Sequence, residues 1–441
     1  MLSAEEIAKT AVAASSVLRP VSNEARVSAL KRIYSTLIAN KASILEANKL
    51  DLENAEKNNI AGPLIKRLDL SKSDKFDAMC QGVLDVAELP DPIGKVTFAS
   101  KLDDGLDLYR ITCPIGVLLV IFESRPEVIA NITALAIKSG NAVILKGGKE
   151  SLKTFTEVSK LIREALSETE IPSGAVQLIE SRQDVADLLK QDQYIDLVVP
   201  RGSNELVRNI KENTKIPVLG HADGLCSAYI NGDADVDMAV RIVLDSKTNY
   251  VAACNAIEGL LIQKGSAMVK ILPAIAKALL EAGVTLKVTS EIAEALKTAG
   301  VSDDKKIVPA EDKDFETEFL SLVIAITAVD DVDAAIRHIN AHSSKHTDVI
   351  VTSSKDTAER FMSGVDSAGV YWNASTRFAD GFRYGFGTEV GISTSKIHAR
   401  GPVGLEGLTC YQYQLRGTGQ VAGDYMGAGG KKEFKHEKID L

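Results

Sequence analysis

One cysteine stands in a segment that could support covalent catalysis. Cys254 lies in residues 249–256, a stretch of mostly small residues between an expected helix and an expected strand. A thiolate attacks a carbonyl carbon only where small neighbours admit the substrate and nearby donors hold the developing oxyanion. Asn255 carries such a donor. The segment therefore indicates a nucleophile, whereas Cys80, Cys113 and Cys226 fit the commoner role of small apolar side chains.

Two glycine-containing turns follow expected strands and could bind phosphate groups. Lys146 and Lys149 flank two glycines directly after the strand expected at 142–145, and Arg-Gly-Ser-Asn at 201–204 follows the strand expected at 195–199. Small residues let a phosphate approach the N–H groups of a helix start. However, no strand is followed by a Gly-x-Gly-x-x-Gly fingerprint. Two interpretations stay open, a nucleotide site and an exposed basic turn.

Three histidines have the spacing of metal ligands on one helical face. His338, His342 and His346 are separated by four residues. The polar residues at 343–344 and 347–348 indicate that the helix ends between them, and no Asp or Glu lies at ligand spacing on the same turn. We therefore expect no metal site from these histidines.

The densest polar stretch runs from residue 371 to residue 407. Its many glycines and polar residues predict loops with special backbone angles rather than packed elements. Arg377 and Arg383 in this stretch could bind a carboxylate or a phosphate in a fork. A purely structural loop cluster is the alternative, and composition does not separate the two.

These residues are expected on an α/β scaffold. Strands and helices alternate between residues 115 and 199, which predicts a parallel sheet covered on both faces, with ligands at the carboxyl ends of its strands. A less regular alternation after residue 223 predicts a second α/β domain, and residues 1–90 show helical periodicity. The strands are expected at 115–122, 142–145, 176–179, 195–199, 259–262, 285–288, 322–326 and 348–351. The helices between and after them are expected at 127–139, 154–166, 183–189, 236–247, 268–282, 291–299, 332–341 and 354–362.

Bulk properties restrict the class of protein. The length of 441 residues favours more than one domain, and 45% hydrophobic with 25% charged residues is typical of a soluble globular protein. The net charge of -9 and the lack of a basic block argue against nucleic-acid binding. No apolar run approaches the roughly 20 residues that span a bilayer, and the N-terminus does not resemble a secretory signal. Five scattered cysteines fit a reducing compartment, so the cytosol is expected.

Seven stretches, in the right order, resemble the gamma-glutamyl phosphate reductase family of the aldehyde dehydrogenase superfamily. The similarity covers nearly the whole chain. Its most specific parts are residues 122–126, 145–150, 200–203, 252–256, 346–348, 373–381 and 398–404. The resemblance implies an aldehyde dehydrogenase-like fold, with a parallel-sheet cofactor domain, an α/β catalytic domain and a β oligomerisation arm.

The resemblance also implies domain boundaries. Residues 1–94 and 112–222 would form the NADPH-binding domain, residues 223–402 the catalytic domain, and residues 95–111 and 403–441 the oligomerisation arm and tail. A hairpin with strands near 95–99 and 106–111, together with residues 408–416, would form the arm of a homodimer or larger homo-oligomer.

Site residues are implied by the same resemblance. Cys254 would be the nucleophile, and Lys149, which replaces the Glu of many NAD-using relatives, should favour the 2′-phosphate of NADPH. Ser124 stands where hydrolytic relatives place an oxyanion-holding Asn. The full set is Cys254, Asn255 and Ser124 for catalysis, Lys146, Lys149, Gly202, Ser203, Gly220 and Glu318 for the cofactor, and Arg125, Arg377 and Ser375 for the substrate, with no metal ligand.

The implied reaction is the reduction of L-glutamyl 5-phosphate to L-glutamate 5-semialdehyde by NADPH, with release of phosphate through a Cys254 thioester. This reaction is the second step of proline biosynthesis, and the glutamate kinase that precedes it would be a separate chain, which this one could contact. The stretch 218–224 lacks the Glu base of hydrolytic relatives, so phosphate rather than water should exchange with the thiolate.

Two alternatives stay open. One is a hydrolytic or CoA-acylating aldehyde dehydrogenase of another substrate class. The other is a catalytically degenerate partner of glutamate kinase, because Val251 stands where the family usually has Pro and could loosen the loop that carries Cys254.

Overall fold

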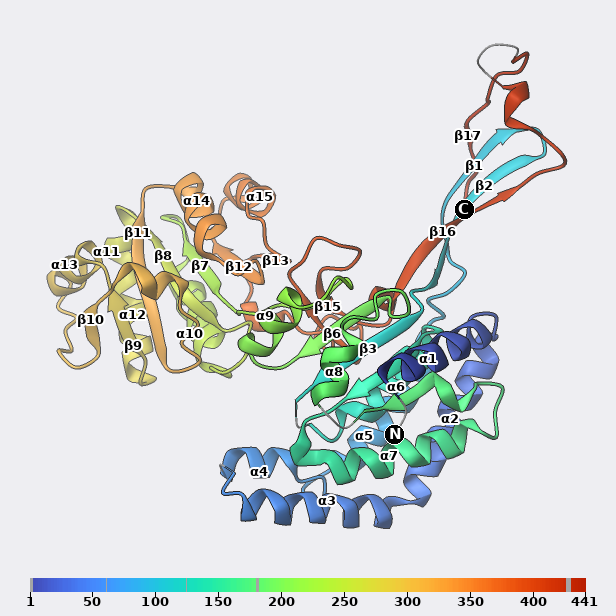
Figure 1. Cartoon of the computed structure of the whole chain (residues 1–441). Coiled ribbons are helices and arrows are strands. Elements are labelled where there is room, and N and C mark those ends of the chain that lie inside the picture. The colour runs from blue at the N-terminus through green and yellow to red at the C-terminus, as the bar shows by residue number, and fades with distance from the viewer. Residues whose placement is uncertain (1–2, 61, 124, 180–181, 426–429) are drawn as a thin grey trace.

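The computed structural model describes residues 3–60, 62–123, 125–179, 182–425 and 430–441. Within these residues the chain folds into two α/β lobes and an antiparallel arm that projects away from both (Figure 1). The lobe of lower residue numbers carries the N-terminal helices, and the C-terminus lies on the arm. No helix in the described part of the chain is both long and apolar enough to cross a membrane.

The first lobe contains a parallel sheet with strand order β5-β4-β3-β6. Its two central strands, β3 and β4, are buried along their whole length, as expected for a sheet covered on both faces. The strands are β3 (Val117–Phe122), β4 (Ala142–Lys146), β5 (Val176–Leu178) and β6 (Leu197–Arg201). The helices around the sheet are α1 (Ala4–Leu18), α2 (Asn23–Ala39), α3 (Lys41–Lys57), α4 (Gly62–Leu68), α5 (Lys75–Glu88), α6 (Val128–Lys138), α7 (Leu152–Leu166), α8 (Arg182–Leu188) and α9 (Asn204–Glu212).

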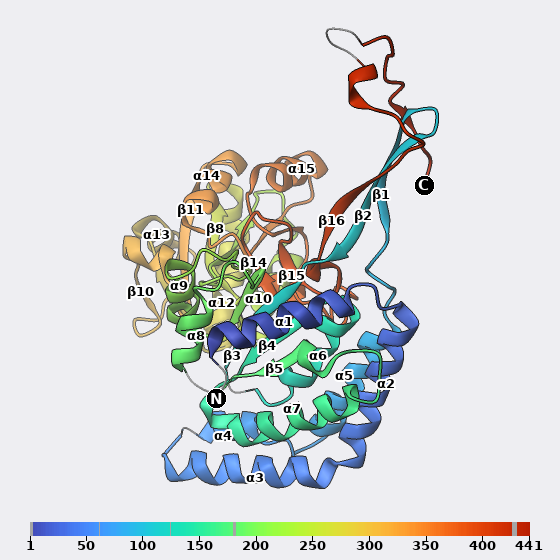
Figure 2. The ribbon, with the colours of Figure 1, turned by 45° about the vertical axis from the view of Figure 1, so that its right-hand side comes forward.

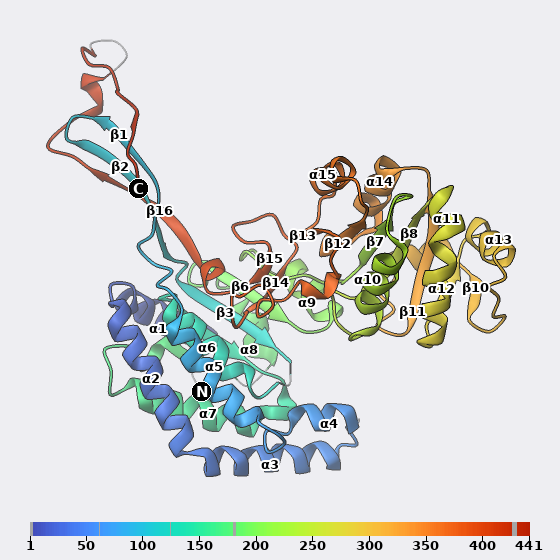
Figure 3. The same cartoon turned by 180° about the vertical axis from the view of Figure 1, so that it is seen from behind.

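The second lobe contains another parallel sheet, with strand order β10-β9-β11-β8-β7-β12-β13. Its strands are β7 (Cys226–Ile230), β8 (Ile257–Gln263), β9 (Thr285–Val288), β10 (Ile307–Pro309), β11 (Val323–Val329), β12 (Thr347–Val351) and β13 (Gly369–Trp372). Its helices are α10 (Val236–Thr248), α11 (Ser266–Lys270), α12 (Leu272–Glu281), α13 (Ser290–Thr298), α14 (Val332–His342) and α15 (Lys355–Gly364). Figure 3 shows α14 and α15 apart from α11, α12 and α13, which agrees with the separate apolar clusters on this sheet.

The chain returns to the first lobe after the second sheet. Val390, Val403 and Leu408 belong to the same apolar core as β3 and β4. A small antiparallel pair lies among them, β14 (Gly391–Ser393) directly after Val390 and β15 (Gly401–Val403), which ends at Val403. The loops between residues 373 and 404 are therefore anchored on one lobe and reach toward the other.

The arm is an antiparallel sheet with strand order β16-β2-β1-β17, visible at the top of Figure 2. Its strands are β1 (Val96–Asp103), β2 (Leu106–Pro114), β16 (Thr409–Arg416) and β17 (Glu437–Lys438). The expected hairpin and the expected strand near residues 408–416 are both confirmed. β16 lies at the edge of the sheet, and Tyr411, Tyr413 and Leu415 on it are exposed.

Several elements differ from expectation for identifiable reasons. The helix expected at 268–282 is broken into α11 and α12, because Pro273 lacks an N–H and starts a new helix. β7 was not expected, since Ser227 and Ala228 weaken its strand signal. α14 does end at His342, before His346, as the polar residues indicated.

Candidate active site

The amino ends of three neighbouring strands bring Cys254 and His346 together. β7 lies between β8 and β12, and the three strands are parallel, so their amino ends meet at one edge of the sheet. Cys254 lies just before β8, and His346 immediately precedes β12. Gly224, just before β7, packs directly against the Cys254 loop: a Cβ at this position would lie 2.3 Å from the carbonyl oxygen of Cys254. Only glycine fits there without moving the loop that carries the cysteine.

The thiol of Cys254 is partly shielded from solvent and lies in a field that disfavours its ionisation. Burial, together with the carboxylates of Glu389 and Glu318, raises the pKa of Cys254 to about 12, while Arg377 opposes the rise. The Sγ of Cys226 donates to the carbonyl oxygen of Cys254 at 3.3 Å, which helps fix the backbone of the loop. The thiol is therefore protonated in this arrangement, and attack requires a change in its surroundings, such as a bound cationic or proton-accepting group.

Two neutral histidines lie beside the thiol. One ring nitrogen each of His221 and His346 and the Sγ of Cys254 all lie within 4.8 Å of one another. Burial lowers the pKa of His346 to about 3 and also lowers that of His221, so both rings are neutral near pH 7. His221 Nδ1 lies 3.2 Å from the carbonyl oxygen of Ile392, to which it donates, and His346 Nδ1 lies 2.9 Å from Thr347 Oγ1.

The other two histidines of the regular spacing are separate from this group. His338 and His342 lie on α14 with ring centroids 4.5 Å apart, and His342 pairs with Glu316 at 3.1 Å. Among the residues that the structure describes, they form no ligand cluster with His346.

Asn255 holds the catalytic loop to the loop that carries Arg377. Its Nδ2 donates to the carbonyl oxygen of Ala379 at 2.9 Å, and its own carbonyl accepts from Thr376 Oγ1 at 2.6 Å. One of its two amide N–H groups is therefore engaged in shaping the site. Ser375 has a similar position, because its hydroxyl accepts from the Arg377 N–H at 3.2 Å and lies 3.1 Å from the Ser246 hydroxyl.

Arginine side chains surround the thiol on the side of the first lobe. Arg377 is half-buried and near Cys254, and its Nε has no hydrogen-bond partner among the described residues. Arg201, at the end of β6, donates through Nη1 to the carbonyl oxygen of Glu389 at 3.3 Å. Arg125 is exposed, and its charge acts on both Arg201 and Glu389. Ser124 lies outside the described residues.

The carboxyl edge of the first sheet carries the expected cofactor residues. Lys146 ends β4 and donates to the carbonyl oxygen of Gly147. Gly147 has no room for a side chain, because a Cβ there would lie 2.1 Å from the Phe155 ring. Lys149 follows in a short 3₁₀ turn (Lys149–Ser151) that leads into α7. Both lysines therefore stand where a strand ends and a helix begins.

The start of α9 already holds an anionic group. The N–H of Ser203 donates to Glu123 Oε1 at 2.7 Å, and a Cβ on Gly202 would meet the same carboxylate at 2.7 Å. The carboxylate occupies the position that a phosphate would take at a helix N-terminus. Gly220 lies nearby, packed on Pro200 and accepting from Lys211 Nζ at 3.3 Å.

Glu318 lies between the carboxyl edge of the first sheet and the amino edge of the second sheet. Its Oε2 accepts from Asn204 Nδ2 at 3.1 Å, at the start of α9, and its charge acts on Cys254. Burial raises the pKa of Glu318. Asn204 also donates to Asp223 at 2.7 Å, and Asp223 is further paired with Arg208. The acid in the 218–224 stretch is therefore engaged by two partners.

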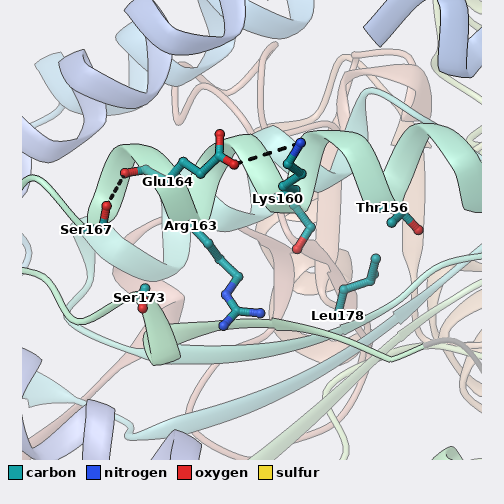
Figure 4. A pocket seen from close by; sticks show the side chains of 8 residues that line it. Thr156, Lys160, Arg163, Glu164, Ser167, Ser173 and Leu178 are labelled. Carbon is teal, nitrogen blue, oxygen red and sulfur yellow. Dashed lines mark hydrogen bonds and ion pairs between the residues drawn. The ribbon is translucent and has the colours of Figure 1, made fainter. Parts of the chain in front are cut away.

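A hollow of about 450 Å³ lies elsewhere, between α7 and β5 (Figure 4). Lys160 and Glu164 lie one turn apart on α7 and pair at 3.9 Å, and Arg163 extends from the same helix. None of its lining residues belongs to the predicted site.

Sequence reasoning did not assign His221, Arg201 or Glu389 to the site. Arg201 stood in a recognised stretch, 200–203, and His346 in another, 346–348. His221 and Glu389 had no local pattern that indicates chemistry, since only the folded chain brings them to Cys254.

Comparison with known proteins identifies the family. The profile of the aldehyde dehydrogenase family matches residues 2–308. Gamma-glutamyl phosphate reductase of Saccharomyces cerevisiae is 59% identical, with 100% of this chain and 99% of that protein covered. The crystal structure of gamma-glutamyl phosphate reductase from Thermotoga maritima superposes with a TM-score of 0.90 at 38% identity, covering 95% of this chain and 100% of that chain. The crystal structure of the Saccharomyces cerevisiae protein gives a TM-score of 0.54 at 52% identity, covering 96% and 100%. The chain therefore belongs to the gamma-glutamyl phosphate reductases, oxidoreductases of the aldehyde dehydrogenase family.

Proposed function

We propose that this protein reduces L-glutamyl 5-phosphate to L-glutamate 5-semialdehyde with NADPH and releases phosphate, in the second step of proline biosynthesis. The observation that carries the proposal is the position of Cys254. Its thiol lies near Arg377 and Glu318, and Glu318 accepts from Asn204 at the carboxyl edge of the first sheet, where the cofactor is proposed to bind. Relatives named gamma-glutamyl phosphate reductase, up to 59% identical over the whole chain, support the same activity.

In the proposed mechanism the sulfur of Cys254 attacks the 5-carbonyl carbon, and the C–O bond to phosphate breaks to leave a thioester. Arg377 and Arg125 are the cations that could neutralise the substrate's phosphate or α-carboxylate. Ser375 contributes by holding the backbone of Arg377. Cations near the sulfur, such as Arg377, oppose the rise in the pKa of the thiol that burial and the two carboxylates cause.

NADPH supplies the hydride that converts the thioester to the aldehyde. Lys146 and Lys149 are the proposed contacts of the ribose and its 2′-phosphate, and Gly202 with Ser203 is the proposed seat of the pyrophosphate. The Glu123 carboxylate on the Ser203 N–H supports this assignment, because it shows that the donor accepts an anion. Glu318 and Gly220 would hold the nicotinamide end near Cys254.

The proposed oxyanion donors are backbone N–H groups of the Cys254 loop, with Asn255 as the residue that positions them. Asn255 ties the loop to Ala379 and Thr376, so its removal would shift the cysteine as well as remove a donor. Ser124 remains a proposed member of the catalytic set.

Phosphate rather than water is the proposed partner of the thioester. The 218–224 stretch has no Glu, and its Asp223 is held by Asn204 and Arg208. Among the carboxylates near the thiol, Glu389 accepts from the Gly381 N–H at 2.9 Å and Glu318 from Asn204.

The test runs the reaction in reverse, from glutamate semialdehyde and NADP, with and without inorganic phosphate. NADPH formation that continues only with phosphate is the expected result. Equal turnover without phosphate would show that water resolves the thioester and would favour a hydrolytic enzyme. No turnover in either case would favour another substrate class or a protein without catalytic activity.

We also propose that the arm joins copies of this chain into a homo-oligomer. β16 is an edge strand with exposed Tyr411, Tyr413 and Leu415, and such edges pair with further strands. Light scattering should give a mass of at least twice that of the chain, and a monomeric mass would contradict the proposal.

A further inference from the structure

The nucleophile and the two histidines beside it have the composition of a transition-metal site. Cys254 Sγ and one nitrogen each of His221 and His346 lie within 4.8 Å of one another. Thiolate sulfur and imidazole nitrogen are the ligands that Zn²⁺ prefers, at about 2.3 Å and 2.1 Å. Tetrahedral bonds of these lengths place ligand atoms about 3.5 Å apart. The three atoms must therefore move only about 1 Å closer to one another to close around an ion.

The histidines are oriented as metal ligands usually are. Zinc-bound imidazoles commonly hold their second nitrogen against a carbonyl, a carboxylate or a water. His221 Nδ1 donates to the carbonyl oxygen of Ile392, which leaves Nε2 as the nitrogen with a lone pair. His346 Nδ1 is engaged by Thr347 Oγ1. In the tautomer in which His346 Nδ1 donates to Thr347 Oγ1, Nε2 of His346 likewise carries the lone pair that an ion requires.

One of these nitrogens is buried without a partner. His346 is 1% exposed, and its Nε2 has no hydrogen-bond partner among the described residues. A polar atom that is buried without a partner has lost its hydrogen bonds to water, so a ligand that engages it is favoured.

Charges of both signs lie near the thiol, and the group is accessible from solvent. Glu389 and Glu318 both lie close enough to Cys254 for their charges to act on it, as do Arg377 and Arg201. Cys254 and His221 are each partly exposed, so an ion can enter from solvent and keep a fourth position for water.

We propose that Cys254, His221 and His346 form a reversible zinc site that blocks the nucleophile. Binding of Zn²⁺ forms one sulfur–zinc and two nitrogen–zinc bonds and releases the thiol proton to solvent, without any change in oxidation state. The sulfur lone pair is then engaged, so Cys254 cannot attack a carbonyl. Chelation of the ion restores the thiol. Free zinc thereby becomes an inhibitor that acts at the site of chemistry.

The test measures metal binding directly and needs no turnover. The full-length enzyme is stripped with EDTA, titrated with Zn²⁺ in competition with a chromogenic chelator, and examined with Co²⁺ for a thiolate-to-cobalt charge-transfer band. We expect a tight site that binds one ion per chain, with a band that is lost in Cys254→Ser. His346→Gln and His221→Gln should each weaken Zn²⁺ binding at least tenfold.

Two matched controls come from the same chain. The double variant His338→Gln, His342→Gln removes the neighbouring histidines of α14, whose rings lie 4.5 Å apart. Cys410→Ser removes a thiol that lies 3.5 Å from Cys113 Sγ. Both should leave the tight site unchanged.

Equal Zn²⁺ affinity in wild type, His221→Gln and His346→Gln would overturn the proposal, as would a Co²⁺ spectrum without a thiolate band. If His346→Gln does not fold, His221→Gln decides alone, since this side chain is partly exposed. A failed zinc site would leave the reductase activity intact, so the two proposals are tested separately.

Discussion

The two parallel sheets meet at opposite ends of their strands. The first lobe presents carboxyl ends, where Lys146 and Ser203 stand at strand-to-helix turns. The second lobe presents amino ends, where Cys254 and His346 precede β8 and β12. The first edge uses main-chain donors and small residues, which suit a ligand that is bound but not transformed. The second edge concentrates partly buried titratable side chains, which suit bond making and breaking. The proposed function thus places cofactor binding on the first sheet and bond making on the second.

Loss of the nucleophile gives the largest expected effect. Cys254→Ser should lower kcat at least about 10³-fold, because a serine hydroxyl stays protonated and attacks poorly. The rate of NADPH formation from the semialdehyde, NADP and phosphate measures it. Cys226→Ser is the control, since its side chain contacts the carbonyl of Cys254 but not the proposed substrate. Activity of Cys254→Ser within tenfold of wild type would transfer the nucleophile's role to another group.

Crowding of the second edge should give the next largest effect. Gly224→Ala places a Cβ 2.3 Å from the Cys254 carbonyl oxygen, so the loop must move. Displacement of a reacting atom by about 1 Å lowers kcat by about 10²-fold. Gly259→Ala on β8 is the matched control, because its Cβ would meet only the Ser227 side chain, at 3.1 Å. Steady-state kinetics of the two variants give the comparison. Equal kcat values would show that the close approach of Gly224 does not position the nucleophile.

Changes at the first edge should affect binding more than chemistry. Lys149→Glu should raise the KM for NADPH about tenfold or more and shift preference toward NADH, because a charge-assisted contact to the 2′-phosphate becomes a repulsion. Lys146→Ala should raise the same KM with little change in kcat. Lys153→Ala, exposed on the next turn of α7, should have no effect. A fall in kcat with unchanged KM in Lys149→Glu and Lys146→Ala would contradict the proposal that the first sheet binds the cofactor while the second carries the chemistry.

A surface network at the second edge gives the smallest expected effect. The Asp366 carboxylate contacts Lys396 at 2.7 Å, Arg400 at 3.1 Å and Lys345 at 3.3 Å, and these cations, Lys396 foremost, lower the pKa of Asp366 to about 2. Its contribution to stability is therefore complete above the unfolded pKa of about 3.9 and is lost as the pH falls toward 2.

Asp366→Asn should lower the free energy of unfolding by about 1 kcal/mol at pH 7, and the difference from wild type should shrink as the pH falls below 4. Urea unfolding across this pH range measures both quantities. Asp440→Asn, at a fully exposed carboxylate 3.8 Å from Lys438, should show neither change. A difference between Asp366→Asn and wild type that persists at pH 2 would mean that packing, not charge, links this residue to stability.

The carboxyl edge of the first sheet could be predicted from the sequence because the pattern that indicates it is local. Lys146 and Ser203 each follow a clear buried strand, so their place at carboxyl ends needed no knowledge of strand order. To predict the amino edge of the second sheet, one must know the strand order β8-β7-β12, and the sequence of β7 gives only a weak strand signal. From the sequence, His346 therefore shows only its spacing to His338 and His342 on α14 and its place in the stretch 346–348, and nothing places it beside Cys254. Asn255 shows another limit: the bond of its amide to the Ala379 carbonyl depends on a loop more than a hundred residues away.

The most direct test of the central proposal is mass spectrometry of the Cys254 peptide after reaction of the enzyme with semialdehyde and NADP, quenched in acid. Without phosphate, we predict one equivalent of NADPH and a glutamyl adduct on Cys254, which added phosphate removes before the quench. An unmodified Cys254 during NADPH formation, or an adduct that phosphate does not remove, would contradict a thioester that is resolved by phosphate.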